Sequence, residues 1–263
     1  MTTTLDIQRH GPVARVFLNR PEVRNAFNQT TIAQMTQVFA ELSADTQLRA
    51  IVLGGHGKAF CAGADLGWMR AMADFNWEQN RADAQALADM LWAVWRCPVP
   101  VVGRVHGDCY AGGVGLAAVC DVLVAAEGVN FCLSEAKLGL LPGTISPYVI
   151  RAMGEQASRR YFVTAERFSA TQAHAMGFVH ELCAADALDA RVDEIVATLV
   201  ANGPMAARAC KKLVQDVAGL PLDESLRTET ARRIADIRAS DEGREGVQSF
   251  LNKRAPAWLV PPR

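Results

Sequence analysis

The residue whose setting points most directly to chemistry is Glu135, in the stretch FCLSEAKLG. Its neighbours along the chain are mostly apolar: Phe131, Leu133, Leu138, Leu140 and Leu141. A carboxylate that loses water contacts among such side chains has a raised pKa and can exchange a proton near neutral pH. The alternative is a glutamate that caps a turn or pairs with Lys137 in solvent, and the local sequence leaves both interpretations open.

Two glycine-rich segments add groups that suit a carbonyl substrate. They are HGKAFCAGADLGWM at residues 56–69 and HGDCYAGGVGLAAVCD at residues 106–121, and each follows a β-branched apolar run. Backbone N–H groups at two such strand ends can polarise one carbonyl oxygen from two sides, as in an oxyanion hole. Taken alone, each segment is explained more simply by tight turns or close helix packing. Neither has the spacing of a nucleotide-binding GxGxxG or GxxxxGK[ST] motif.

The composition of the 263 residues argues against several kinds of partner and cofactor. With 27 Lys and Arg against 28 Asp and Glu, a formal net charge of −1 gives no field that attracts nucleic acid or an acidic membrane. The five histidines form no HxxxH or HExxH pattern, so we expect no bound metal. The seven cysteines contain no CxxC pair, which is typical of reduced thiols. Without a signal core or a membrane-length apolar run, the chain is expected to be cytoplasmic.

The apolar pattern predicts the elements that must position these groups. β-branched runs predict strands at residues 13–18, 50–53, 99–105 and 122–125. Apolar residues at three- and four-residue spacing predict helices at residues 28–43 and 82–95. Strands that alternate with helical crossovers indicate an α/β fold.

The last quarter of the chain has a different pattern. It predicts successive helices at about 186–201, 204–218, 222–239 and 241–251. We therefore expect a core at residues 1–185 that holds the active site, and a helical region at residues 186–263 for assembly and active-site cover. The final LVPPR, with its two prolines, is expected to lie outside regular structure.

Six motifs together resemble the crotonase family, also called the enoyl-CoA hydratase/isomerase superfamily. AFCAGADLGWM, HGDCYAGGVGLAAVCD and FCLSEAKLGLLP follow one another at the family's spacing. NRPEVRNAFN, AHAMGFVHEL and FLNKRAPAW extend the resemblance over residues 10–258. The resemblance implies a spiral of ββα repeats followed by C-terminal helices that form trimers, often paired as hexamers. Periodicity alone does not predict that spiral.

The resemblance also implies roles for individual residues. The oxyanion-hole donors would be the backbone N–H groups of Ala64 and Gly112, with Glu135 as the catalytic acid and base. The substrate would be an acyl-CoA thioester, and no separate cofactor is implied because CoA is part of the substrate. Lys253 resembles a C-terminal residue that can reach the CoA of a neighbouring subunit. The remaining contacts with CoA would come from Arg24, near the phosphates, and from Ala62, Gly63, Ala64, Asp65 and Leu66.

One position departs from the pattern of typical hydratases in this family. They use two glutamates to position a water and deliver its proton, and the first of these falls on Gly115 here. A single glutamate suits an enoyl-CoA isomerase, or a hydratase in which Glu135 handles both proton steps. Loss of a glutamate also suits a non-catalytic acyl-CoA binder. Ser146 and Tyr148 are candidates for holding a water, although a structural role is the simpler interpretation of both.

Finer resemblance favours the hydratase. Residues 131–168 resemble bacterial enzymes of leucine and acyclic-terpene catabolism that hydrate 3-methylglutaconyl-CoA or its isohexenyl relative. Several other residues have structural interpretations: His106 as a hydrogen-bonded histidine, and the pairs Lys211-Lys212 and Arg232-Arg233 as solvated helix faces. Trp68, Met69 and Met72 are interpreted either as core residues or as the lining of an acyl pocket.

Overall fold

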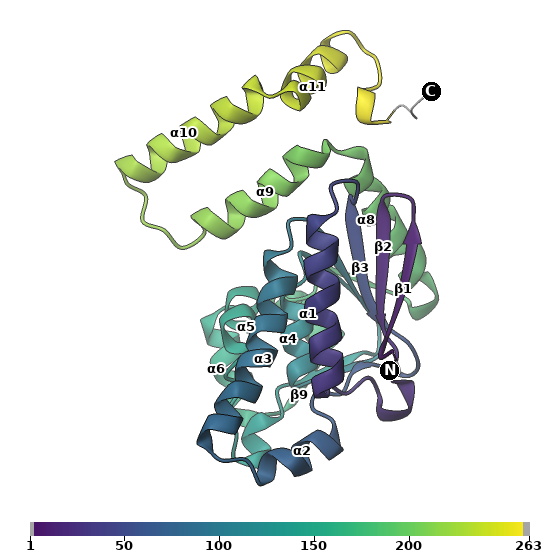
Figure 1. The fold of residues 1–263 in the computed structure, drawn as a ribbon, viewed down its shortest axis with the longest axis vertical. Coiled ribbons are helices and arrows are strands. Elements are labelled where there is room, and N and C mark those ends of the chain that lie inside the picture. The colour runs from purple at the N-terminus through teal and green to yellow at the C-terminus, as the bar shows by residue number, and fades with distance from the viewer. Residues whose placement is uncertain (1–2, 260–263) are drawn as a thin grey trace.

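The computed structural model describes residues 3–259 and contains two β-sheets. The larger sheet has six strands (Figure 1), which in spatial order are β1 (Leu5–His10), β2 (Val13–Leu18), β3 (Ala50–Gly55), β5 (Val101–Val105), β7 (Val122–Ala126) and β10 (Glu181–Cys183). β1 pairs with β2 in an antiparallel hairpin, and the other pairings are parallel. The four predicted strands coincide with β2, β3, β5 and β7, so the α/β assignment is confirmed.

The smaller sheet is built from strands of three residues each. Its order is β4 (Ala59–Cys61), β6 (Asp108–Tyr110), β8 (Asn130–Cys132) and β9 (Arg167–Ser169). β4, β6 and β8 are parallel to one another, and β9 is antiparallel to β8. The chain enters the larger sheet at β3, β5 and β7 and passes each time into the smaller sheet at β4, β6 and β8. Each such pair of strands is followed by a helix, which is the ββα spiral that the resemblance implied.

Helices cover the sheets and close the core. α1 (Gln29–Ala44) packs beside α3 (Trp77–Arg96), and α8 (Leu188–Ala201) packs on β3, β5 and β7. Asn28 caps α1 by accepting a hydrogen bond from the Thr31 N–H, and the predicted apolar stripe Ile32, Met35, Phe39 and Leu42 is buried. The other helices that follow the strands are α2 (Leu66–Ala73), α4 (Gly112–Ala118), α5 (Ser146–Met153), α6 (Glu155–Thr164) and α7 (Ala170–Ala175).

Three further helices project from one end of the molecule. They are α9 (Pro204–Val217), α10 (Glu224–Ala239) and α11 (Asp241–Leu251), and none of the residues of α9 or α10 is buried. α9 is joined to the core by polar contacts from one face. Arg208 donates to the carbonyls of Asp45 and Leu48, and Lys211 binds the Asp121 carboxylate at 2.6 Å.

Two predictions for this region have different outcomes. The interpretation of Lys211 as part of a solvated helix face is wrong, because its side chain is only 7% exposed and is drawn in by Asp121. Arg232 pairs with Glu229 on the exposed face of α10, as expected, whereas Arg233 is 29% exposed and also binds Asp216 of α9 at 2.8 Å. The four predicted C-terminal helices are present, and the predicted irregular ending at residues 260–263 lies outside the described residues. Within residues 3–259, no helix combines the length and apolar character needed to cross a membrane.

Candidate active site

The candidate site lies where the three parallel strands of the smaller sheet end. Cys61 of β4 pairs with Cys109 of β6, and Tyr110 of β6 pairs with Cys132 of β8. Ala64, Gly112 and Glu135 each follow one of these paired residues by two or three positions. Because the carboxyl ends of adjacent parallel strands meet at one edge of a sheet, the register places the three turns side by side.

The backbone of Phe27 orients the first of these turns. The Phe27 N–H donates to the Gly63 carbonyl at 2.7 Å, and the Phe27 carbonyl accepts from the Asp65 N–H at 2.8 Å. In a parallel bridge of this kind, the N–H of the intervening residue, Ala64, points to the opposite side. Among the described residues nothing accepts a hydrogen bond from it. Ala64 therefore presents a free donor at the strand edge.

The second turn presents Gly112, the first residue of α4. The N–H at this position has no partner inside its own helix, and no other described residue accepts from it. Ala111, just before it, has φ 48° and ψ −119°, a conformation that non-glycine residues rarely adopt. The Ala111 N–H donates to the Cys132 carbonyl at 2.8 Å, which fixes this strained turn on β8.

Gly63 joins the two turns. Its φ is +90°, and a Cβ built on it would lie 2.9 Å from the Ala111 Cβ and 3.8 Å from the Gly112 nitrogen. The backbone of the first turn is therefore in contact with the residues that carry the second donor. Only glycine permits both the positive φ and this close approach.

Glu135 begins a 3-10 helix, η2 (Glu135–Leu138), directly after β8. It is half-buried, and its Oε2 atom is shielded from solvent without a hydrogen-bond partner in residues 3–259. Burial raises the pKa of this carboxyl above its ordinary value of 4.5. Because this Oε2 atom is buried without a partner and no ion pair joins Glu135 to Lys137 within residues 3–259, the alternative of a solvated pair does not describe this residue.

The source of this burial differs from the prediction. Phe131 and Leu133 are fully buried, as expected, but three leucines that were predicted to shield the carboxylate are exposed. These are Leu138, Leu140 and Leu141, at 59%, 57% and 76%. Leu138 ends the short η2 helix, and Leu140 and Leu141 lie in the irregular segment that follows it, so the side chains face outward in a way that sequence spacing alone did not reveal.

Together these groups are suited to the chemistry of a carbonyl compound. Two fixed N–H donors can stabilise negative charge on one oxygen, and a poorly hydrated carboxylate nearby can take and return a proton. Such an arrangement favours reactions that pass through an enolate.

The predicted CoA-binding segment, Ala62 to Leu66, lies beside Arg24. The Ala62 N–H donates to the Arg24 carbonyl at 3.0 Å, and the Arg24 side chain is exposed. Asp65 is committed within the protein: its carboxylate caps α2 at Gly67 and Trp68 and forms an ion pair with Arg20 at 2.9 Å. Leu66 is 70% exposed and free to contact a ligand.

Lys253 lies apart from the other predicted site residues. It directly follows α11, and its N–H donates to the Phe250 carbonyl. Figure 1 places α11 and α2 at opposite ends of the long axis of the molecule. Within one chain, Lys253 therefore does not share a site with residues 62–66.

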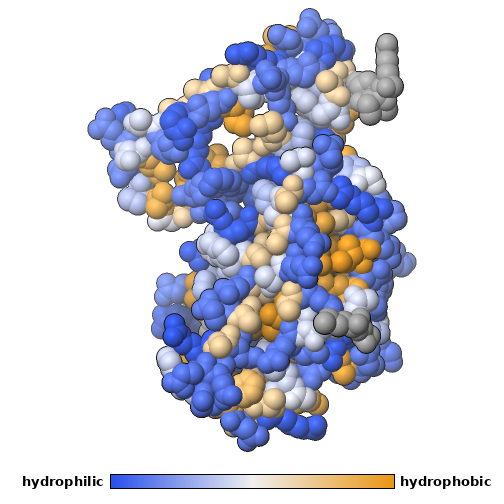
Figure 2. All heavy atoms as spheres, viewed as in Figure 1, coloured by the Kyte–Doolittle hydropathy of each residue, from blue (hydrophilic) through white to orange (hydrophobic). Residues whose placement is uncertain are grey.

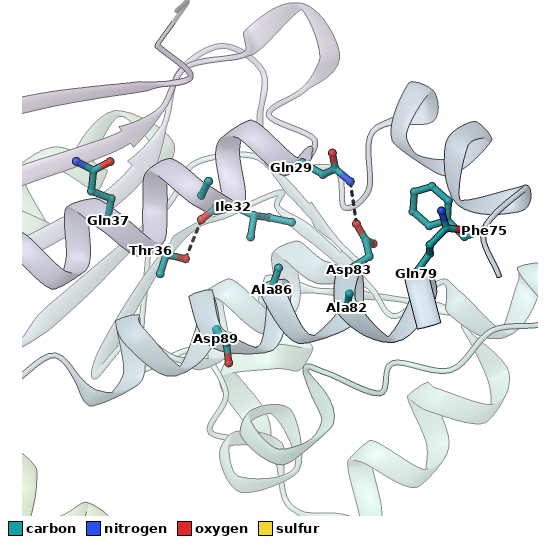
Figure 3. A pocket seen from close by; sticks show the side chains of 11 residues that line it. Gln29, Ile32, Thr36, Gln37, Phe75, Gln79, Ala82, Asp83, Ala86 and Asp89 are labelled. Atoms are coloured by element: carbon teal, nitrogen blue, oxygen red, sulfur yellow. Dashed lines mark hydrogen bonds between the residues drawn. The ribbon is translucent and has the colours of Figure 1, made fainter. Parts of the chain in front are cut away.

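Two large grooves of the described chain lie away from this site. One, of about 770 Å³, runs between α1 and α3 and is crossed by a hydrogen bond from Gln29 to Asp83 (Figure 3). Another, of about 1010 Å³, lies between α5 and α9 and is lined by Tyr148. Neither includes Ala64, Gly112 or Glu135. The geometry of the backbone turns, rather than the size of a cavity, identifies the candidate site.

Comparison with known proteins agrees with this geometry. The sequence profile described as "Enoyl-CoA hydratase/isomerase" matches residues 8–260. The chain belongs to this family. It is 34% identical over 256 residues to the enoyl-CoA hydratase ACTT6 of Alternaria alternata, covering 96% of this chain and 83% of the relative.

Solved structures show the same fold. An enoyl-CoA hydratase from Shewanella pealeana superimposes with a TM-score of 0.94 at 40% identity, over 97% of this chain and 96% of its own. AtuE of Pseudomonas aeruginosa gives a TM-score of 0.94 at 36% identity, over 98% of this chain and 100% of its own. The crotonase fold expected from the motifs is thereby confirmed.

In this crotonase-family chain, the other candidate residues have structural partners. The Ser146 hydroxyl donates to the Gly143 carbonyl, and the Tyr148 ring packs near Trp95 in the α5–α9 cavity. The His106 Nε2 atom is bonded to the Gly57 carbonyl at 3.1 Å, and burial lowers the pKa of this histidine. Trp68 is buried and Met72 packs against the same core, whereas Met69 remains half-buried beside them.

Sequence reasoning missed the residues that support this crotonase-family site. Phe27 brackets Ala64, and Asn25 below it donates from Nδ2 to the carbonyls of His56 and Ala59. Asn25 has a positive φ of 56° and is 1% exposed. Both residues lie in the motif NRPEVRNAFN, which marked the family without indicating what the residues do.

Proposed function

We propose that this protein is an enoyl-CoA hydratase that adds water to the double bond of a 2-enoyl-CoA. One observation carries the proposal: two unbonded backbone N–H groups and one half-buried carboxylate, with an unpartnered Oε2 atom, follow the paired ends of β4, β6 and β8. The hydratases among its relatives support the same reaction.

In the proposed reaction, the thioester carbonyl oxygen binds between the N–H groups of Ala64 and Gly112. The Glu135 carboxylate takes a proton from water as the water oxygen bonds to the β-carbon. The electron pair of the double bond moves onto the thioester oxygen, where each amide contributes about 3 kcal/mol of stabilisation. The protonated Glu135 then returns its proton to the α-carbon. The raised pKa of Glu135 suits both steps, because it makes the carboxylate a stronger base near neutral pH.

CoA recognition is proposed for the surface around the first turn. Arg24 would contact the phosphates, because its side chain is exposed and its backbone is tied to Ala62. Residues 62–66 would contact the pantetheine and adenine. Asp65 would contribute mainly by holding this segment in place, since its carboxylate is bound to Arg20 and α2.

The acyl group is proposed to be branched and carboxylated, such as 3-methylglutaconyl. This rests on the resemblance of residues 131–168 to hydratases of leucine and acyclic-terpene catabolism. An enoyl-CoA isomerase is the second candidate, and Gly115 favours it because moving one proton needs only one carboxylate. The third candidate is a non-catalytic acyl-CoA binder.

Assembly is proposed to proceed through the projecting helices. Figure 2 shows hydrophobic patches on them, and Val214, Phe250 and Leu251 are 66%, 81% and 70% exposed. A trimer, or a hexamer of paired trimers, would cover these side chains and would bring Lys253 to the CoA of a neighbouring subunit. We propose a cytoplasmic location without nucleic-acid or membrane partners, and CoA bound only as part of the substrate.

The test is turnover of a panel of thioesters by wild type and Glu135→Gln. The hydratase should consume 3-methylglutaconyl-CoA or crotonyl-CoA with loss of enoyl absorbance, and Glu135→Gln should lower kcat about 10³-fold while product binding persists. Fastest turnover of 3-hexenoyl-CoA, with formation of the 2-enoyl isomer, would favour the isomerase. Binding without turnover of any member would favour the third candidate.

A further inference from the structure

Gly115 and Ile145 are in direct contact across α4 and α5. A Cβ built on Gly115 would lie 2.1 Å from the Ile145 Cγ2 atom and 2.6 Å from its Cβ. Both residues are buried, and Ile145 is 2% exposed. Non-bonded carbon atoms do not approach within 3 Å, so no side chain fits at residue 115 while Ile145 keeps its place.

Ile145 cannot easily withdraw from this contact. The clash involves its branched Cβ, which moves only with the backbone, and not only the end of a flexible chain. Its carbonyl accepts from the N–H groups of Tyr148 and Val149, at the start of α5. The preceding loop is fixed as well, since the Ser146 N–H donates to the Pro142 carbonyl and the Leu140 N–H to the Glu135 carbonyl.

The position matters because Gly115 is close to the proposed chemistry. It lies three residues after Gly112 on α4, and residues three apart share one face of a helix. A side chain at residue 115 would therefore lie on the face of α4 that carries Gly112, one turn from the helix start. Ile145 fills that space with an aliphatic side chain.

We propose that Ile145 is a positioning residue that holds this active site to a single carboxylate, by excluding both a side chain at residue 115 and water from that side of α4. This inference rests on the proposed hydratase reaction. With that side closed, water reaches the substrate only from the side of Glu135, and Glu135 serves both proton steps. The missing glutamate is then a feature fixed by packing, and a single substitution at residue 115 does not restore it.

The packing half of the proposal is tested by melting temperature, which needs no turnover. Gly115→Ala should lower the Tm by about 5 °C or more in the wild-type background. In an Ile145→Gly background, which also removes the Cβ at 2.6 Å, the same substitution should leave the Tm unchanged or raise it, because alanine favours a helix once space is available. An equal loss in both backgrounds would overturn the contact as the cause.

The chemical half is tested by placing an acid in the opened space. Gly115→Glu/Ile145→Gly should gain a second ionisation in the pH profile of kcat/KM. With Glu135→Gln added, it should retain at least tenfold more hydration than Glu135→Gln alone. A Gly115→Glu variant with wild-type Tm and a second ionisation would refute the proposal, as would no gain in the triple variant. A wild-type enzyme that hydrates no enoyl-CoA would refute the proposed function, while the melting comparison would still test the packing.

Discussion

Replacing Gly63 by alanine is expected to lower both the stability of the fold and the catalytic rate, and a matched control distinguishes the two effects. The residue has φ +90°, so the substitution costs about 1–2 kcal/mol in folding stability. The new methyl group would also lie 2.9 Å from the Ala111 Cβ and 3.2 Å from the Tyr110 carbonyl oxygen. Both neighbours belong to the turn that aims the Gly112 N–H, so relief of the clash must move this proposed oxyanion donor.

The size of the catalytic effect follows from that displacement. Loss of one oxyanion donor costs about 3 kcal/mol in transition-state stabilisation, or roughly 10²-fold in kcat. Gly128→Ala is the matched control, because Gly128 has φ +85° and no atom within 4 Å of a Cβ. Both variants should lose stability in urea or thermal unfolding, Gly63→Ala the more because its methyl group also clashes, but only Gly63→Ala should lose kcat in steady-state hydration.

The outcome that refutes this reasoning is specific. If Gly63→Ala keeps kcat within about threefold of the Gly128→Ala control, the two turns do not form a shared donor pair. A similar loss of kcat in both variants would attribute the effect to stability alone.

Four further predictions concern Glu135, Lys211 and Glu242. Because burial raises the pKa of Glu135 above 4.5, the acid limb of kcat/KM should lie above that of an ordinary glutamate, with activity lost as the pH falls through the raised value. The folded state holds this proton more tightly than the unfolded state, so ionisation of Glu135 destabilises the fold as the pH rises. Glu135→Gln should therefore lose activity yet have a higher Tm than wild type at pH 7. A lower Tm would contradict this. Lys211→Met should lower the free energy of unfolding in urea by about 3–5 kcal/mol, because it leaves the partly buried Asp121 without its ion pair. Substitution of its exposed neighbour, Lys212→Met, should lower it by at most about 1 kcal/mol. Equal losses would show that Asp121 is well solvated. Glu242 accepts hydrogen bonds from the N–H groups of Met205 and Ala206 at the start of α9. Glu242→Ala should therefore lower the free energy of unfolding by about 1 kcal/mol and speed amide hydrogen exchange in α9 and α11 alone. Unchanged exchange would mean that this cap does not hold the two helices together.

Long elements were predictable from the sequence because their patterns have room to repeat. β2 carries six residues in an alternating burial pattern, and α1 buries four apolar residues at helical spacing. β4, β6 and β8 have three residues each, too few to display any period, and they form because neighbouring strands supply their hydrogen bonds. These are the strands that carry the candidate site, so its architecture was accessible only through motif resemblance.

Contacts between residues far apart in the chain could not be predicted from local sequence patterns. The Arg20–Asp65 pair, the Lys211–Asp121 pair and the Gly115–Ile145 contact join residues separated by 45, 90 and 30 positions. The error at Leu138, Leu140 and Leu141 has a similar origin. Apolar residues next to an acid in sequence indicate burial only if the backbone turns them inward, and neither the 3-10 helix that ends at Leu138 nor the irregular segment after it does so.

The three-residue strands of the smaller sheet have a consequence for how the protein loses activity. Both amide donors and the carboxylate are extensions of β4, β6 and β8, and a few ladder hydrogen bonds keep all three in register. Local opening of the smaller sheet alone would separate the two amide donors from the carboxylate while the larger sheet stayed intact. Gentle warming should therefore inactivate the enzyme reversibly at temperatures below its global melting transition.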